Sequence, residues 1–476
     1  MSSHFQYLRS ALLNWYPFAP GNRALLAGEN TQPLMPLLKK HFQTVDTAPA
    51  EGERYNCIAA ADYAEKAEDL PALLRSLCRL LDDDGVLLLA FRNRFGLKYL
   101  CGGTDEYVKT AFSTLQPAGG GARLYGRNEM KELLLRAGFA PPRFYYLMPD
   151  ADFVQAVYTD DLLPEDSIRD RVFPFDLHDS PLIAWESDLY DDMVRERALP
   201  FAANVYLAEC RKPGAAAPKK NVVYAALSTD RGEENSFATV LYSDGTACKR
   251  PLFPKGLPYL EKVCANMAEL SARGILTVSH TMTGSGIEMP LVREEGLLHY
   301  LRRQLPDHTE AFLSVFDRIW QDVLRSSPPA EETPDSLAEI WGAGRDQLGP
   351  ILKSALIDMI PYNAFWSDGR IRYYDQEFRV ENCPAAYVLF RAIRYTWLHI
   401  PEAEKYLPLE EMKKRCRLTE TWDGFMAREN RFVAGNRNVE ALKEIYDHAN
   451  PDRTAILRRR RQLGAASDHD PCKELK

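Results

Sequence analysis

The stretch GVLLLAF at residues 85–91 is apolar at every position after its glycine. A short run without polar alternation is typical of a strand that is buried on both faces, as in a parallel sheet covered by helices. Strand-like and helix-like runs alternate before it, at residues 23–27, 34–42, 42–45, 55–59 and 70–81. This alternation predicts an α/β fold with a doubly wound, mostly parallel sheet.

The chain beyond this sheet predicts a second domain. A helix-like run at 125–138 and further strands extend the first domain to about residue 210, and RKPGAAAPKK at 211–220 has the composition of a linker. Strand-like runs and then mostly helical runs follow, which predicts a two-lobed α+β domain. We therefore expect domains at 1–210 and 221–400, joined by the linker, and a C-terminal helical extension with a basic tail at 401–476.

Bulk composition excludes several classes of protein. The chain has 476 residues, a length that favours two domains, and its net charge of −8 argues against nucleic acid as a partner. No apolar run approaches the roughly 20 residues that span a bilayer, so we expect a cytoplasmic protein without a transmembrane segment. The 9 cysteines form no C-x-x-C pair, which favours free thiols over a disulfide framework or a zinc site.

The stretch IDMIPYNAFWSDGRIRYYDQEF at residues 357–378 carries three polar side chains suited to phosphoryl transfer. Such chemistry needs carboxylate and amide oxygens that hold magnesium, and a carboxylate that takes the acceptor's proton. Asp358 and Asn363 lie on one loop, and a tight turn at 367–369 predicts a hairpin that brings Asp375 beside them. The alternative is that these side chains only cap turns, where Asp and Asn are favoured.

The spacing D-x-x-P-x-N, followed by an Asp after a hairpin, resembles the catalytic and metal loops of the protein-kinase and aminoglycoside-phosphotransferase superfamily. The resemblance implies ATP and Mg²⁺ as cofactors, Asp358 as the catalytic base, and Asn363 and Asp375 as magnesium ligands. It also implies that Lys249 pairs with the nucleotide phosphates. Glu269 is then the expected ion-pair partner of this lysine, with Glu261 as its rival. The His-Arg pair that precedes the base in protein kinases is missing here, because residues 356 and 357 are Leu and Ile.

The first strand and helix suggest a nucleotide-like site. Gly28 follows the first strand, and Asp46 ends the second strand 18 residues later. A glycine at a strand end lets the backbone approach a ligand, and an acidic residue after the next strand can bind ribose hydroxyls. The sequence has no second glycine at this strand end, so the pyrophosphate of a dinucleotide would find no room beside the backbone. S-adenosyl-L-methionine, which carries no phosphate, needs less room.

The order of elements resembles a class I S-adenosylmethionine-dependent methyltransferase. The segments at 90–99, 144–153, 375–378 and 388–395 are similar to bacterial surface-polysaccharide proteins in which a methyltransferase domain precedes a kinase-like domain. The resemblance covers residues 20–400. The chain departs from it at LAGENTQ (26–32), where the family has a glycine-rich loop. It also departs between Asp46 and Tyr55, where the residues are too few for the usual helix and third strand, whose end supplies an acidic residue to the adenine. Either Asp62 compensates for the missing acidic residue, or the pocket no longer binds the cofactor.

Two functions follow from these resemblances. As an enzyme, the chain is expected to transfer a methyl group, a phosphoryl group or both to a bacterial surface glycan or to its nucleotide-sugar or lipid-linked precursor. Alternatively, it is an inactive scaffold that recruits a glycosyltransferase. The basic run at the C-terminus, formed by Arg458, Arg459, Arg460 and Arg461, allows weak contact with an anionic membrane surface, although solvated charges at a helix end are the more ordinary interpretation.

Overall fold

The computed structural model describes residues 9–115, 123–165, 167–169, 171–218, 220–228, 231–305, 307–331, 336–437, 443 and 447–467. The chain divides into two compact units. The first comprises Met1–Asp230, Ala238–Asp244 and Val439–Lys476, and the second comprises Arg231–Phe237 and Gly245–Asn438. These bounds count residues 221–230 with the first unit and residues 401–438 with the second, so they differ from the bounds expected of the domains.

The first unit is built on a sheet whose strands follow the order β9-β8-β6-β5-β7-β4-β3-β1-β2. The bounds are β1 Gly21–Gly28, β2 Phe42–Asp46, β3 Tyr55–Ala61, β4 Leu81–Arg92, β5 Arg143–Asp150, β6 Phe153–Thr159, β7 Val205–Cys210, β8 Val222–Leu227 and β9 Phe237–Tyr242. The neighbours β2, β1, β3 and β4 pair in parallel. This confirms the predicted α/β fold with a Rossmann-like sheet. β3 pairs directly with β1, and only residues 47–54 separate it from β2.

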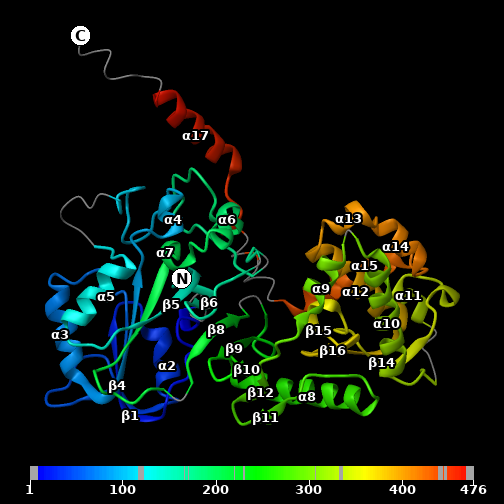
Figure 1. Cartoon of the computed structure of the whole chain (residues 1–476), viewed down its shortest axis with the longest axis horizontal. Helices are drawn as coiled ribbons and strands as arrows, with labels where there is room; N and C mark the ends of the chain where they lie inside the picture. The colour runs from blue at the N-terminus through cyan, green and yellow to red at the C-terminus, as the bar shows by residue number, and fades with distance from the viewer. Residues whose placement is uncertain are drawn as a thin grey trace. The chain divides into compact units, whose positions relative to one another are not determined.

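The helices of the first unit form for reasons visible in the sequence. Its helical elements are η1 Gln32–Leu34, α2 Met35–Leu38, α3 Leu70–Leu80, α4 Leu97–Leu100, α5 Arg127–Arg136, η2 Glu186–Leu189, α6 Tyr190–Arg195, α7 Leu199–Ala202 and α17 Arg453–Ser467. The Asp69 side chain accepts a hydrogen bond from the Ala72 backbone nitrogen at 2.9 Å, which caps α3. Leu70, Leu74 and Leu77 then form a stripe that is buried in the core. Figure 1 shows α3 and α5 side by side along the sheet.

The second unit has a strand-rich part followed by a helical part, as the sequence predicts. Its strands are β10 Thr246–Pro251, β11 Thr281–Thr283, β12 Gly286–Pro290, β13 Glu295–Gly296, β14 Ile351–Leu356, β15 Ala364–Ser367, β16 Arg370–Tyr373 and β17 Arg379–Pro384. Its helices are η3 Pro254–Gly256, α8 Leu257–Ala272, α9 Leu297–Gln304, α10 Thr309–Ser326, α11 Leu337–Trp341, η4 Arg345–Gln347, η5 Pro361–Asn363, α12 Ala385–His399, α13 Ala403–Tyr406, α14 Leu409–Arg415 and α15 Trp422–Asn436. Each part has its own cluster of buried apolar side chains. One is centred on α8 and β12, and the other on α10 and α12.

The predicted hairpin before Asp375 is present. β15 and β16 pair antiparallel, and the two residues between them, Asp368 and Gly369, have φ angles of +48° and +73°. Positive φ at both central positions is the geometry of the tight hairpin turn whose twist matches the strands, and Asp-Gly is a favoured sequence for it. The chain direction therefore reverses between Asn363 and Asp375, as their spacing predicts.

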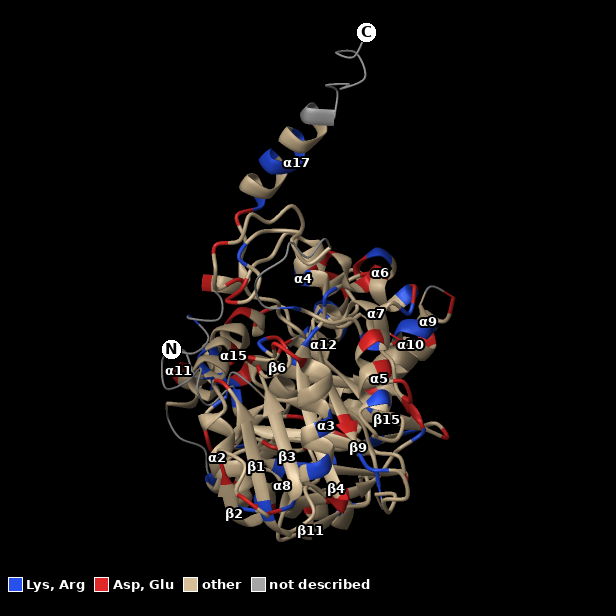
Figure 2. Cartoon of the chain, turned by 90° about the vertical axis from the view of Figure 1, so that its left-hand side faces the viewer, with Lys and Arg blue, Asp and Glu red and all other residues tan. Residues whose placement is uncertain are grey.

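The basic run lies on α17, which belongs to the first unit. Figure 2 shows the blue of its arginines along this helix. Arg459 is half-buried and donates a hydrogen bond to the Leu182 carbonyl oxygen at 3.1 Å, whereas Arg458, Arg460 and Arg461 are exposed. Contact between these arginines and a membrane stays a prediction. No helix in the described ranges is both long and apolar enough to span a bilayer.

Candidate functional site

The carboxyl ends of several strands meet at one edge of the sheet in the first unit. β1, β3 and β4 run parallel, and β5 runs the same way because β7 lies antiparallel between β4 and β5. These strands end at Gly28, Ala61, Arg92 and Asp150. Doubly wound sheets bind their ligands outside this edge. The predicted residues Gly28, Asp46 and Asp62 all lie at strand ends here.

Gly28 is required by the packing of the strands themselves. Its φ is +103°, and a Cβ atom added to it would lie 1.8 Å from the carbonyl oxygen of Ala61 at the end of β3. A side chain rarely adopts this φ, and here it also has no room. The close approach of two strand ends therefore accounts for this glycine without a ligand.

Replacing Gly28 by Ala is expected to lower the free energy of unfolding by more than about 2 kcal/mol, because backbone strain and a backbone clash act together. Gly52→Ala is the matched control, since Gly52 also has a positive φ, +74°, but nothing lies within 4 Å of an added Cβ. The control should cost only about 1 kcal/mol. Urea unfolding curves measure both effects, and equal losses in the two variants would contradict the role of Ala61.

The three predicted residues of this half do not share one site. Gly28 and Asp62 line a hollow of about 490 Å³ together with Lys66 and Asp69, and Asp46 is not among its lining residues. Asp46 instead accepts hydrogen bonds from Arg23 Nη1 and from the Tyr55 hydroxyl, both at 3.2 Å. The structure therefore brings Gly28 and Asp62 together and holds Asp46 in contacts within the sheet.

Asp62 is buried and already paired with two arginines. Its carboxylate forms ion pairs with Arg9 and Arg92, which are themselves buried. The backbone nitrogen of Arg92 donates to Glu65 Oε1 at 2.7 Å. Sequence reasoning missed both arginines. The position of Arg92 directly after the apolar run of β4 was a usable signal, but nothing in the sequence marks Arg9, which precedes the first strand.

Lys249 lies on β10 and pairs with two carboxylates of the segment that follows β16, residues 375–378. Its side chain is buried and forms ion pairs with Asp375 and Glu377. The prediction that Lys249 forms an ion pair with Glu269 is wrong. Glu269 pairs with Arg379 Nη2 at 2.5 Å, because it lies near the C-terminal end of α8, within reach of the start of β17. The rival, Glu261, is exposed on α8.

Asp358 follows β14 and is held by a buried arginine. Its Oδ1 accepts a hydrogen bond from Arg391 Nη1 at 2.9 Å, and its Oδ2 accepts one from the Phe378 backbone nitrogen at 3.1 Å. Burial raises the pKa of Asp358 above its ordinary value, and the charge of Arg391 opposes this shift. The carboxylate is therefore fixed in one orientation between α12 and the backbone at Phe378.

The other end of Arg391 contacts α15. Its Nε donates to Glu429 Oε2 at 2.9 Å, and Glu429 also accepts hydrogen bonds from the hydroxyls of Tyr387 at 2.5 Å and Tyr395 at 2.8 Å. Glu429 is completely buried. Residues beyond 400, expected to form an extension, thus help to hold Asp358. The sequence showed Arg391 on an apolar helix, but it did not show which carboxylates pair with it.

Asn363 lies beside Asp358 and contacts its backbone. The side-chain nitrogen of Asn363 is 3.5 Å from the Asp358 carbonyl oxygen, and the Asn363 carbonyl oxygen accepts a hydrogen bond from the Tyr374 backbone nitrogen at 3.0 Å. The hairpin thus returns the chain to Asn363 one residue before Asp375. The structure brings Asp358 and Asn363 together on one loop, and places Asp375 directly after the strand that returns to them.

Glu377 is a functional candidate that sequence reasoning missed. It is buried, and it pairs with Arg231 Nη1 at 2.7 Å as well as with Lys249. Burial alone would raise the pKa of Glu377, but the charges of Lys249 and Arg231 outweigh this and hold it below the ordinary value. Burial raises the pKa of Asp375, and the neighbouring charge of Glu377 adds to this. The spacing Asp-x-Glu after the hairpin was the available signal.

The donor set at Lys249 fits a nucleotide-bound magnesium ion. Among the residues that the structure describes, no group of three or more His, Cys, Asp and Glu side chains is arranged to hold a metal ion by itself. Magnesium in nucleotide sites is held by one or two carboxylates, and water and phosphate oxygens complete its shell. Asp375 and Glu377, which both contact Lys249, supply two such carboxylates.

Comparison with known proteins bears on the first unit. Residues 21–141 match the family model described as a methyltransferase domain. No curated protein matches the chain. Among solved structures, a SAM-dependent methyltransferase from Archaeoglobus fulgidus is 12% identical, with 44% of this chain and 94% of that chain covered at a TM-score of 0.27. A macrolide 2'-phosphotransferase from Brachybacterium faecium is 15% identical, with 48% of this chain and 93% of that chain covered at a TM-score of 0.23. Likenesses at these scores carry no argument about activity.

The family match and the strand order agree on the first unit. The matched residues contain the parallel strands β1 to β4 and helices α3 and α5. They also contain Gly28, Asp62 and Arg92 at the carboxyl edge of the sheet. The chain therefore carries a methyltransferase-like domain within its first unit.

Proposed function

We propose that the second unit transfers a phosphoryl group from ATP with Mg²⁺ to an acceptor hydroxyl. The observation that carries this proposal is the contact of Lys249 with both Asp375 and Glu377. Phosphoryl transfer needs a cation for the phosphates, carboxylates for magnesium and a carboxylate that receives a proton. The second unit holds each of these groups on described residues.

The contacts of the candidate residues in this unit support a role for each of them. Asp358 takes the proton of the acceptor hydroxyl, and Arg391 and the Phe378 backbone nitrogen keep its carboxylate oriented. Lys249 exchanges part of its contact with the carboxylates for contact with phosphate oxygens. Asp375 and Glu377, with the Asn363 amide oxygen, are the residues that would hold the magnesium ion. Bound magnesium would neutralise charge on the phosphates.

The proposed acceptor is a glycan of the bacterial surface or its nucleotide-sugar or lipid-linked precursor. This part rests on the resemblance of the segments at 144–153 and 375–378 to methyltransferase-kinase proteins. Within the same proposal the first unit binds S-adenosylmethionine in the hollow at Gly28 and Asp62 and transfers its methyl group. The family match over residues 21–141 supports that second activity.

Two observations favour the competing scaffold function for the first unit alone. Arg9 and Arg92 already neutralise Asp62, and the space beside Gly28 is filled by the Ala61 carbonyl group. A first unit that cannot bind the cofactor would serve as a docking surface for a glycosyltransferase. Ligand binding separates these alternatives without knowledge of the acceptor.

Thermal unfolding with ATP and Mg²⁺, and separately with S-adenosylmethionine, tests both sites. A ligand that binds only the folded state stabilises it by about 2.7 kcal/mol at a concentration of 100 times its Kd. We expect ATP with Mg²⁺ to raise the Tm of the wild-type protein, and Lys249→Met to remove most of that increase. Lys262→Met, an exposed lysine on α8, is the matched control and should keep the increase.

The outcomes are distinct for the two units. If ATP with Mg²⁺ leaves the Tm unchanged, or if Lys249→Met and Lys262→Met respond alike, the phosphotransferase proposal is wrong. If S-adenosylmethionine raises the Tm and Asp62→Asn weakens this effect, the first unit binds the cofactor. If S-adenosylmethionine has no effect, the proposal of methyl transfer by the first unit is wrong.

A further inference from the structure

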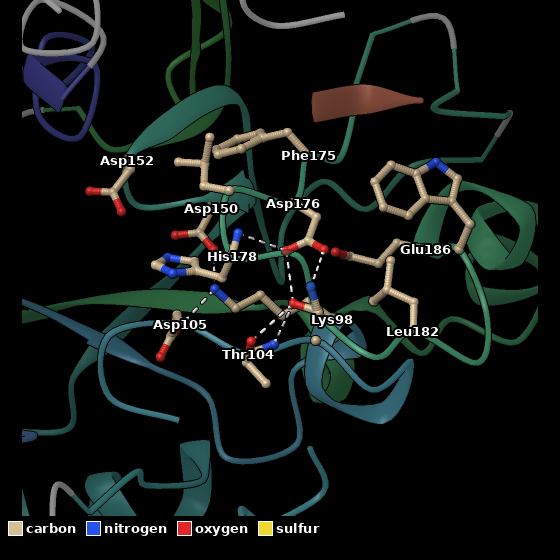
Figure 3. A pocket seen from close by; sticks show the side chains of 14 residues that line it. Lys98, Thr104, Asp105, Asp150, Asp152, Phe175, Asp176, His178, Leu182 and Glu186 are labelled. Carbon is tan, nitrogen blue, oxygen red and sulfur yellow. Dashed lines mark hydrogen bonds and ion pairs between the residues drawn. The ribbon is translucent and has the colours of Figure 1, made fainter. Parts of the chain in front are cut away.

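The polar pocket in Figure 3 shows how acidic side chains of the first unit are satisfied by the protein itself. Lys98 Nζ lies 2.6 Å from Asp150 Oδ2 and 3.1 Å from Asp105 Oδ2. Asp176 accepts hydrogen bonds from the Ser180 backbone nitrogen and from the Ser180 hydroxyl, both at 2.7 Å. Because these contacts satisfy the carboxylates, the pocket does not by itself indicate a ligand.

Tyr259 in the second unit carries a buried hydroxyl that the protein does not satisfy. The residue lies in the first turn of α8, and its Oη has no hydrogen-bond partner among the residues that the structure describes. A buried donor that is left unpaired is costly, and a ligand that accepts its hydrogen bond removes that cost. None of the roles proposed above uses this hydroxyl.

The ring of Tyr259 packs against two aromatic side chains that border the phosphoryl-transfer site. Its centroid is 5.7 Å from that of Phe237 and 6.3 Å from that of Phe378. Lys249 Nζ lies over the Phe237 ring, 4.9 Å from the centroid. The Phe378 backbone nitrogen donates to Asp358 Oδ2 at 3.1 Å. One neighbour of the tyrosine therefore borders the phosphate-binding lysine, and the other borders the proposed base.

The surroundings of Tyr259 keep its hydroxyl protonated. Burial raises the pKa of Tyr259, and the charges of Glu377 and Asp358 raise it further, whereas the charge of Arg231 acts in the opposite direction. The side chain is thus an O–H donor at neutral pH. The carboxylates that act on it most strongly are Glu377, which contacts Lys249, and the proposed base Asp358.

We propose that the Tyr259 hydroxyl donates a hydrogen bond to an oxygen of the terminal phosphate of ATP. This phosphate must lie between the magnesium-binding carboxylates and Asp358, because it passes to the hydroxyl whose proton Asp358 accepts. Tyr259 lies next to that place, and a phosphate oxygen supplies the acceptor that the protein lacks. The inference rests on the proposed function of the second unit, and it gives Tyr259 a part in distinguishing ATP from ADP.

Isothermal titration calorimetry of the full chain with two nucleotides, each with Mg²⁺, tests this contact. The probes are ADP and the imido analogue of ATP, in which nitrogen replaces the oxygen between the last two phosphates so that transfer is blocked. Tyr259→Phe keeps the ring and removes only the hydroxyl. It should raise the Kd of the imido analogue about tenfold or more, as expected for a lost hydrogen bond to a charged group, and change the Kd of ADP less than about twofold.

Tyr406→Phe is the matched control, since Tyr406 is exposed on α13, and it should leave both Kd values as in the wild type. The unliganded Tyr259→Phe variant should have a Tm equal to or above that of the wild type, because the hydroxyl that it loses has no partner in the described fold. A lower Tm would show that the protein itself satisfies this hydroxyl, and it would overturn the proposal.

The binding results separate this inference from the function on which it rests. If the wild type binds the imido analogue no more tightly than ADP, the inference is wrong. It is also wrong if Tyr259→Phe binds both nucleotides as the wild type does, or if it weakens both equally, and in each of these cases the phosphotransferase proposal is untouched. If the wild type binds neither nucleotide, the proposed function fails and the inference fails with it.

Discussion

Replacing Asp358 by Asn is expected to reduce ATP-dependent phosphoryl transfer by about 10²–10⁴-fold. The amide cannot accept the proton of the acceptor hydroxyl, although it keeps the size of the side chain. Its carbonyl oxygen can still accept one of the two hydrogen bonds, from Arg391 or from the Phe378 backbone nitrogen. Steady-state kinetics should therefore show a loss in kcat with KM for ATP nearly unchanged.

Asp368→Asn is the matched control for this variant. Asp368 is exposed in the hairpin turn at a φ of +48°, which Asn tolerates well. This control should retain full activity and stability. An Asp358→Asn enzyme that keeps its kcat, or that loses only affinity for ATP, would show that Asp358 has a structural role alone.

Replacing Arg391 by Met should cost about 3–5 kcal/mol of unfolding free energy, because Asp358 and Glu429 would remain buried without their common cation. Removing that cation also raises the pKa of Asp358 further, since Arg391 opposes the effect of burial. Activity that requires ionised Asp358 is lost as the pH falls through its pKa. The acid limb of the pH–kcat profile should therefore move to higher pH in this variant.

Arg394→Met, a half-buried arginine on the same helix, should change the unfolding free energy by less than about 1 kcal/mol. Urea unfolding curves give both values. Adding Glu429→Gln to Arg391→Met should recover part of the stability, because it removes one of the two unpaired charges. Additive losses in the double variant, or an unmoved acid limb in the single variant, would contradict the coupling of Arg391 to Asp358.

Features that depend on neighbouring residues were predicted correctly, whereas a contact between residues far apart in the chain was not. The runs at 23–27, 42–45, 55–59 and 85–91 became β1, β2, β3 and β4. Burial on both faces leaves a local apolar pattern, which is clearest in β3 and in the second half of β4. The hairpin at 367–369 was also predictable from a local signal, because Asp-Gly is a favoured sequence for a tight turn. The expected Lys249–Glu269 pair failed because the direction in which a helix side chain points depends on where the helix begins and on what lies opposite it.

The sequence by itself determined the α/β sheet and the β-then-α order of the second unit, and it marked Lys249, Asp358, Asn363 and Asp375 as candidates for phosphoryl-transfer chemistry. Those features depend on local periodicity, turn chemistry and residue type. Only the tertiary structure decided which charges meet: Glu377 at Lys249, Arg391 at Asp358, and two arginines at Asp62. The physical reason is that an ion pair joins residues far apart in the chain, and no local pattern records its partner.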